Sequence, residues 1–127
     1  MIKLTYPIIN HETIDSLREL GEDSNSAFLL EMIDLFFKHT VPLSEEVREL
    51  VKGHNHLELA SKIHALKSQI ANFGAMGLAQ VCQNIEKDAR ANSYKPNHDD
   101  IRVFMAGFAG MVKELEEIKK IELSRAA

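Results

Sequence analysis

The sequence predicts an all-α protein, an antiparallel four-helix bundle with an additional short N-terminal helix. Apolar residues recur at helical spacing along almost the whole chain, and no segment shows the sustained two-residue alternation of a half-buried strand. Only short stretches of turn-forming residues separate these patterns, so consecutive long helices should lie antiparallel. With 127 residues, the chain is expected to form a single domain, residues 1–127, with its own hydrophobic core.

Composition excludes several classes of protein. A formal net charge of −4 gives no reason to expect nucleic acid as a partner. No apolar run approaches the roughly 20 residues that span a bilayer, and the N-terminus lacks the apolar core of a signal peptide. Cys82 is the only cysteine, which excludes an internal disulfide and fits a reducing compartment. We therefore expect a cytoplasmic protein without a membrane partner.

Two helical segments are expected before the middle of the chain. Asn10 can cap a short first helix that Gly21 ends, and Ser24 or Ser26 can open the second. Pro42 stands where a helix breaks, kinks or restarts, and the pattern then continues to residue 53. The apolar positions are Ile14, Leu17 and Leu20 in the first helix, Phe28, Leu29, Met32, Ile33, Leu35 and Phe36 in the second, and Leu43, Val47, Leu50 and Val51 after the proline.

Three further helices are expected in the rest of the chain. Asn55 is a good N-cap for a helix that Gly74 ends, in a position suited to a positive φ. Another helix follows, then a loop over residues 92–97, and Asn97 or Asp99 caps the last helix. The core positions are Leu59, Ile63, Leu66, Ile70 and Phe73, then Leu78, Val81, Cys82, Ile85 and Ala89, then Ile101, Phe104, Met105, Phe108, Val112, Leu115 and Ile118.

His64 lies on a strip of small side chains. At about 100° per residue, the core positions of its helix fall on the side roughly opposite the imidazole. Lys67, one turn further on, can offer its ammonium to a group attached to the ring, and Ser68 can add a hydroxyl donor. A phosphoryl group, with close to two negative charges, suits such a site. The small residues nearest His64 are Ala60, Ser61, Ser68 and Ala71.

The chain resembles the histidine-containing phosphotransfer (HPt) domains of two-component phosphorelays. The resemblance runs from about Ile14 to Arg90, and the last helix is also similar to that of the family. Upstream, Phe28-Leu29-Leu30-Glu31-Met32, Phe36 and Pro42 fit the looser part of the pattern. The residues that carry the motif are Asn55, His64-Ala65-Leu66-Lys67-Ser68-Gln69, Gly74-Ala75, Leu78, Cys82, Glu86 and Arg90.

The resemblance implies the site and its function. His64 would accept a phosphoryl group from a receiver-domain aspartate or a kinase and pass it to the receiver aspartate of a response regulator. Lys67 would be its charge partner, and Ser68 takes a small position usually filled by Gly. Glu86 takes a position, often Gln in relatives, from which the side chain can hydrogen-bond the imidazole; the alternative is an exposed helix residue. The expected docking residues for a partner are Ala60, Ser61, Gln69 and Ala71.

The expected partners are receiver domains of response regulators and a sensor or hybrid histidine kinase. No cofactor is expected, because the chain has no cluster of carboxylates for Mg²⁺, and the partner receiver domain should supply that ion. No metal site is expected either, since His54 and His56 do not share a helix face and no Glu-x-x-His pair occurs. The chain lacks a glycine-rich phosphate loop, so ATP-dependent kinase activity is not expected. We expect a free-standing monomer.

A rival hypothesis is a helical interaction module that binds a receiver or kinase as an inhibitor or scaffold without carrying a phosphoryl group. Such a module needs neither His64 nor Lys67, which favours the phosphocarrier. Three further side chains are interpreted as structural. Cys82 and Met76 are expected in the core, and Glu122 on the solvated face of the last helix.

Overall fold

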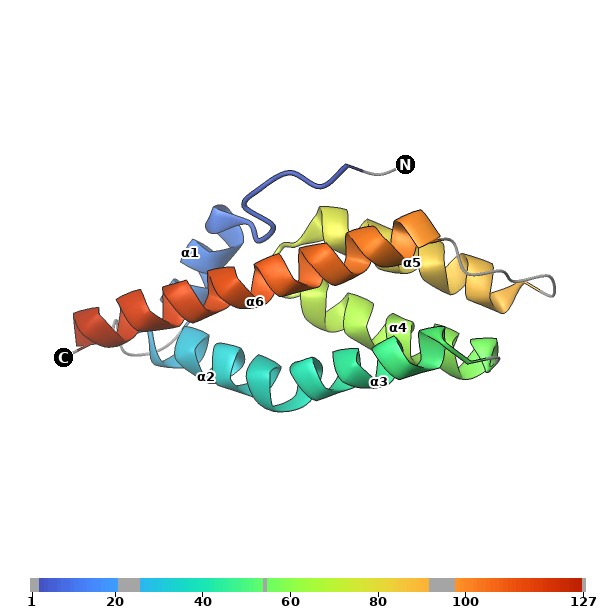
Figure 1. Cartoon of the computed structure of the whole chain (residues 1–127). Coiled ribbons are helices and arrows are strands. Elements are labelled where there is room, and N and C mark those ends of the chain that lie inside the picture. The colour runs from blue at the N-terminus through green and yellow to red at the C-terminus, as the bar shows by residue number, and fades with distance from the viewer. Residues whose placement is uncertain (1–2, 21–25, 54, 92–97, 127) are drawn as a thin grey trace.

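The computed structural model describes residues 3–20, 26–53, 55–91 and 98–126, and every regular element in these ranges is a helix (Figure 1). The all-α prediction is therefore confirmed for that part of the chain. A π-helical turn over Phe36–Thr40 joins the second helix to the third, so the two form one continuous helical segment. The helices are α1 (His11–Glu19), α2 (Ala27–Leu35), α3 (Val41–Val51), α4 (His56–Ala71), α5 (Met76–Arg90) and α6 (His98–Ala126).

The helices pack as a bundle around a shared core. α4 and α5 pack most extensively against each other, α3 lies against α4, and α6 lies against α5 and α2. In Figure 1, α6 runs along most of the length of the molecule, with the α2–α3 segment below it. The residues predicted to form the site, His64 on α4 and Glu86 on α5, therefore lie on the two helices that pack most extensively against each other.

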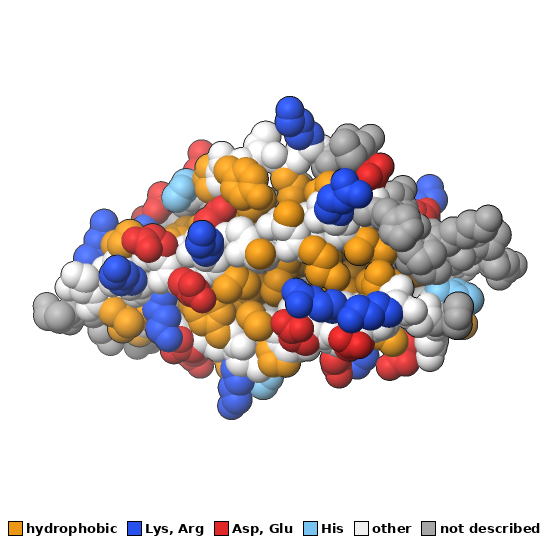
Figure 2. Space-filling model, in the orientation of Figure 1, with side chains coloured by type: hydrophobic (Ala, Val, Ile, Leu, Met, Phe, Trp, Pro, Cys, Tyr) orange, Lys and Arg blue, Asp and Glu red, His pale blue; other side chains and the backbone are white. Residues whose placement is uncertain are grey.

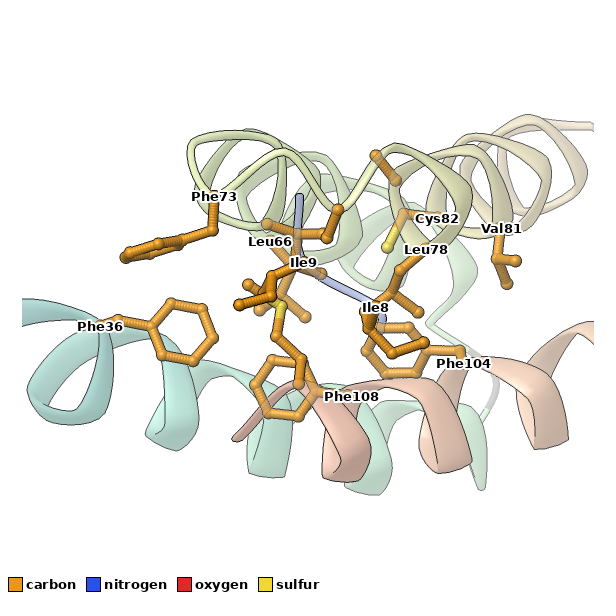
Figure 3. Packing of buried hydrophobic residues seen from close by; sticks show 14 of the residues in the cluster. Ile8, Ile9, Phe36, Leu66, Phe73, Leu78, Val81, Cys82, Phe104 and Phe108 are labelled. Atoms are coloured by element: carbon orange, nitrogen blue, oxygen red, sulfur yellow. The ribbon is translucent and has the colours of Figure 1, made fainter. Parts of the chain in front are cut away.

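Aromatic rings from three parts of the chain meet in the core. The ring of Phe36 packs edge-on against that of Phe73, with centroids 5.5 Å apart, and is stacked near Phe108 at 5.7 Å (Figure 3). Phe104 stacks on Phe108 in turn, at 5.9 Å. The predicted core positions of α4 and α5 are buried, as expected: Leu59, Ile63, Leu66, Ile70, Leu78, Val81, Cys82, Ile85 and Ala89.

Two asparagine caps set where helices begin, as predicted. The side-chain oxygen of Asn10 accepts a hydrogen bond from the backbone N–H of Thr13 at 2.9 Å. The side-chain oxygen of Asn55 accepts one from the N–H of Glu58 at 3.1 Å. Each cap satisfies one of the amide groups that a helix start leaves without an intrahelical partner.

The start of the second helix and the proline region each follow one of the alternatives that the sequence left open, while three apolar residues differ from expectation. Pro42 does not break the helix, because it is in the first turn of α3, directly after the π-helical turn, which changes the backbone hydrogen-bonding pattern there. Ser26 precedes α2 with a left-handed φ of 63° and makes no side-chain cap. Leu20 follows α1 and is exposed, and Phe28 and Leu35 are also exposed, so these three do not belong to the core. The expectations for Gly21, Ser24, His54 and the loop over residues 92–97 with Asn97 lie outside the described residues.

A groove runs between α3 and α6. Figure 2 shows hydrophobic side chains gathered along the middle of this face, between the α6 ridge and the α2–α3 segment. A hollow of about 260 Å³ lies there, lined by residues that include Val41, Arg48, Phe104, Met105 and Val112. These residues belong to α3 and α6, so the groove is separate from the α4–α5 surface that carries His64.

The prediction that Glu122 lies on a solvated face is wrong. Its side chain is only 2% exposed, and its carboxylate accepts hydrogen bonds from Arg18 Nε at 2.9 Å, Arg18 Nη2 at 2.6 Å and Ser26 Oγ at 2.6 Å. Glu114 also has a structural role, since its carboxylate accepts the backbone N–H groups of Ile8 at 2.8 Å and Ile9 at 2.9 Å. All these partners are distant in the sequence, so the spacing of residues along α6 could not predict these hydrogen bonds.

Glu122→Gln should destabilise the fold at neutral pH. Although burial raises the pKa of Glu122, hydrogen bonds from Arg18 and Ser26 and the charge of Arg18 outweigh it and lower that pKa below its ordinary value. A lowered pKa in the folded state stabilises the protein above the unfolded-state pKa and loses that effect as pH falls through the folded value. We expect chemical denaturation at pH 7 to give an unfolding free energy lower by about 1–3 kcal/mol.

The difference between wild type and Glu122→Gln should begin to shrink below the ordinary glutamate pKa of about 4.3, and it should be lost as pH falls through the lower pKa of the folded wild-type carboxylate. Glu116→Gln is the matched control, because Glu116 is exposed on the same helix. A gap between wild type and Glu122→Gln that does not change with pH would contradict an ionised Glu122 as its cause.

Candidate functional site

The His64 side chain faces solvent from α4, and the opposite side of this helix is buried in the core. Ile63 and Leu66, its neighbours in α4, have no exposed surface. The His64 side chain is 58% exposed. Because burial of Ile63 and Leu66 sets the rotation of α4, the imidazole has a defined direction and an accessible edge.

Glu86, from α5, holds one nitrogen of the imidazole. Both of its carboxylate oxygens lie 3.1 Å from His64 Nδ1, and its side chain is only 10% exposed. Because a carboxylate only accepts hydrogen bonds, Nδ1 carries the proton and Nε2 keeps its lone pair when the ring is neutral. The hydrogen-bonding role that the sequence allowed for Glu86 is what the structure contains, and the alternative of an exposed residue is wrong.

Lys67 lies beside the same carboxylate. Its ammonium donates to Glu86 Oε1 at 3.2 Å and to the side-chain oxygen of Gln83 at 2.6 Å. The Lys67 side chain is 24% exposed, and its two hydrogen bonds hold the ammonium at the same carboxylate that His64 contacts. Gln83 thus anchors the cation in the absence of a phosphoryl group.

Arg90 completes the set of donors around Glu86. Its Nε donates to Glu86 Oε2 at 3.1 Å, so each carboxylate oxygen has one cationic neighbour in addition to the imidazole. Burial by itself raises the pKa of Glu86, but the hydrogen bonds from His64, Lys67 and Arg90 together lower it below its ordinary value. The carboxylate is therefore ionised at neutral pH and can orient His64.

Cys82 is a core residue, as predicted. It has no exposed surface, and burial raises its pKa to about 12. Since only the thiolate is a strong nucleophile, a thiol with this pKa stays neutral and unreactive at neutral pH. Cys82 adds no charge to the cluster of Glu86, Lys67 and Arg90.

The small residues expected around His64 do not all reach the surface. Ser61, Ser68 and Gln69 are exposed and Ala71 is half-buried, so these four are available to a partner. The expectation for Ala60 needs correction. Its side chain is completely buried, because this face of α4 turns toward the core, and it therefore has no surface to offer to a partner.

A shallow depression of about 310 Å³ lies beside Lys67, between α4 and α5. Met76, predicted to be in the core, forms part of its wall with 63% of its surface exposed, since it begins α5 at the edge of the bundle. The depression brings Ser68 and Ala71 together with residues of α5 that the sequence analysis had not assigned to the site. Its lining residues are Lys67, Ser68, Ala71, Met76, Ala79, Gln80 and Gln83.

Sequence reasoning missed Gln83 and left Arg90 without a role. A signal was present in both cases, because Gln83 precedes Glu86 by three residues and Arg90 follows it by four, so all three share one face of α5. If Glu86 is assumed to be a buried hydrogen-bond acceptor, the same helix face predicts that Gln83 and Arg90 lie next to it. His64, Lys67 and Glu86, which the sequence did single out, are brought together.

Among the described residues, no group of three or more His, Cys, Asp or Glu side chains could hold a metal ion. In the same part of the chain, no helix combines the length and the apolarity needed to cross a membrane. The site offers an exposed ring nitrogen with a lone pair, a buried carboxylate opposite it and a nearby ammonium. This arrangement can form a bond from Nε2 to an electrophile and place a cation beside a transferred anion.

A family model described as an Hpt domain matches residues 31–120, which includes α3, α4, α5 and most of α6. No curated protein and no solved structure matches the chain at a significant level.

Proposed function

Because the chain belongs to the Hpt domain family, a family of phosphotransfer in two-component signalling, we propose that it is a phosphocarrier with His64 as its phosphorylation site. It accepts a phosphoryl group from a receiver-domain aspartate or a kinase and passes it to the receiver aspartate of a response regulator. The observation that carries the proposal is the hydrogen bond that a buried carboxylate, Glu86, accepts from His64 Nδ1, which leaves Nε2 as the nucleophile on an exposed edge.

In the proposed step, the Nε2 lone pair forms an N–P bond while the O–P bond of the receiver's acyl phosphate breaks. The bonding electrons of the O–P bond remain on the receiver's aspartate, which leaves as a carboxylate. Nδ1 keeps its proton, so the ring gains a positive charge, and the Glu86 carboxylate 3.1 Å away stabilises that charge. Return to a second receiver reverses these changes. Such phosphoryl transfers depend chiefly on positioning and charge stabilisation.

The partner completes the site in this proposal. A receiver domain supplies the Mg²⁺ and its own acidic pocket, while this chain supplies His64 and the ammonium of Lys67. Docking uses Ser61, Ser68, Gln69 and Ala71 around the imidazole. We also propose that the chain acts as a monomer in the cytoplasm, because one histidine suffices for the transfer and the single cysteine suits a reducing compartment.

The test is transfer from a ³²P-labelled receiver domain to this chain in the presence of Mg²⁺. Label that moves to the chain, is lost in acid and survives alkali is the behaviour expected of phosphohistidine. Absence of transfer from every receiver in a panel, with binding intact, would replace the phosphocarrier by the interaction module.

Lys67→Ala should slow phosphotransfer by about ten- to a hundredfold, which corresponds to the loss of one hydrogen bond to a charged group. The ammonium no longer neutralises the phosphoryl oxygens as they approach Nε2. The measurement is the single-turnover rate of label uptake from a receiver at saturating concentration.

Lys62→Ala is the matched control for Lys67→Ala. Lys62 lies on the same helix, and its ion pair with Glu46, at 3.6 Å, points to α3 and away from Glu86. Equal rates for the two variants would show that Lys67 contributes only general positive charge.

A further inference from the structure

Glu86 poses an electrostatic problem for the proposed phosphocarrier. Its carboxylate is buried and lies 3.1 Å from the ring that receives the phosphoryl group. The phosphoryl group adds close to two negative charges. A fixed negative charge beside Nδ1 orients the imidazole but also repels the anionic group that the ring must carry on Nε2. Something must therefore offset Glu86 without detaching it from Nδ1.

The donors around Glu86 are arranged to do so. Among the described residues that contact the carboxylate, α4 contributes His64 and Lys67, and α5 contributes Arg90. Cys82, also near Glu86, stays neutral. One carboxylate and two cations give the cluster a net charge of about +1 before phosphorylation. Without Arg90 the net charge would be about zero, and the phosphoryl group would then make it strongly negative.

Lys67 and Arg90 differ in what they can do after phosphorylation. The ammonium of Lys67 is one turn from His64 on the same helix, and in the proposed function it turns toward the phosphoryl oxygens. That movement removes a cation from Glu86 Oε1. Arg90 is one turn beyond Glu86 on α5, on the side of the carboxylate away from Lys67, and its Nε stays on Oε2.

We infer that Arg90 is a positioning residue that offsets the charge of Glu86, so that Glu86 can orient His64 without shortening the life of the phosphohistidine. The inference rests on the proposed function, and it assigns to Arg90 a role that no contact with His64 itself suggests. Arg90 acts through the carboxylate, and its effect should appear in the imidazole as well as in the phosphorylated form.

The test compares wild type, Arg90→Ala, Arg90→Lys and the control Lys87→Ala, which removes one positive charge from an exposed position on the same helix. The first readout is the titration of the His64 ring in ¹⁵N NMR spectra of the unphosphorylated chain. A less neutralised Glu86 favours the imidazolium, so in Arg90→Ala the midpoint should move to higher pH. Arg90→Lys should restore most of the wild-type midpoint, and Lys87→Ala should match wild type.

The second readout is the lifetime of phosphohistidine formed with phosphoramidate, in which the P–N bond of the reagent breaks, ammonia leaves and Nε2 takes the phosphoryl group. A less neutralised Glu86 holds the proton on Nδ1 more firmly, and an imidazole that keeps this proton is a better leaving group from phosphorus than one that loses it. Arg90→Ala should therefore lose its phosphoryl group about two- to tenfold faster than wild type and Lys87→Ala, a range expected for one partly screened charge.

The two readouts separate this inference from the function on which it rests. A His64 midpoint in Arg90→Ala equal to that of wild type overturns the inference, whether or not the chain takes up phosphate. A shifted midpoint with an unchanged lifetime also overturns it, because the charge would then not matter to the phosphorylated form. If none of the four proteins is labelled at His64 by phosphoramidate or a receiver, the proposed function fails, while the titration still decides whether Arg90 offsets Glu86.

Discussion

His64→Gln will take up no phosphoryl group from a labelled receiver domain. The amide nitrogen of glutamine is conjugated with its carbonyl and has no lone pair that can attack phosphorus. Gln is close to His in size and can still donate a hydrogen bond to Glu86, so the other contacts of Glu86, with Lys67 and Arg90, should persist. The measurement is ³²P transfer in Mg²⁺, followed by gel separation and tests of stability in acid and in alkali.

Two controls make the His64→Gln result specific. His39→Gln changes an exposed histidine on the π-helical turn, outside the two helices that carry His64 and Glu86, and should be labelled like wild type. Thermal unfolding of His64→Gln should remain close to wild type, because the ring is largely exposed and a surface substitution changes stability by about 0.5 kcal/mol or less. Acid-labile label on His64→Gln would place the phosphorylation site elsewhere.

The helices were predictable because their signals are local. Asn10 and Asn55 cap helices through groups only three residues away, and the buried stripe of α4 follows directly from residue spacing. The roles of Glu122 and Glu114 could not be predicted in this way. Arg18 and the backbone of Ile8 and Ile9 are about a hundred residues from these carboxylates, so only the folded arrangement brings them together.

The proline region shows a different limit of sequence reasoning. Pro42 permits a break, a kink or the first turn of a helix, and its own chemistry does not decide among them. The decision comes from packing, since Phe36 on one side and Val47 on the other must both enter the core. A π-helical turn keeps the segment helical while changing the phase between the two faces.

The sequence predicted the central residues of the candidate site, His64, Lys67 and Glu86, but not the roles of the residues around them. The small residues and Lys67 near His64 pointed to the reactive ring, and the family resemblance pointed to Glu86. That Glu86 is buried, and therefore needs Arg90 and Lys67 as charge partners, depends on how closely α5 packs on α4. Packing also overturned the expectation for Ala60. A helical wheel places this small side chain near His64, but in the folded bundle it is completely buried.

Gly74→Ala should lower the unfolding free energy by about 2–4 kcal/mol and the Tm by roughly 10 °C. Gly74 has a φ of +73°, a conformation that costs an L-residue about 1–2 kcal/mol. A Cβ there would lie 2.5 Å from both Asn10 Cβ and Thr13 Oγ1, which form the N-cap of α1. Asn10 cannot easily retreat, because its N–H is bound to the carbonyl of Phe73 at 3.1 Å.

Gly74→Ala should also disturb the geometry of the proposed phosphotransfer site. Gly74 forms the turn that joins α4 to α5, and the distance from His64 Nδ1 to Glu86 depends on how these two helices meet. We expect slower labelling in Gly74→Ala even at temperatures where it remains folded. The control is Gly53→Ala, where a Cβ would meet only the carbonyl oxygen of Leu50 at 3.8 Å, so stability and labelling should both stay near wild type. If Gly74→Ala unfolds like Gly53→Ala, the contact between this turn and the α1 cap does not constrain the fold.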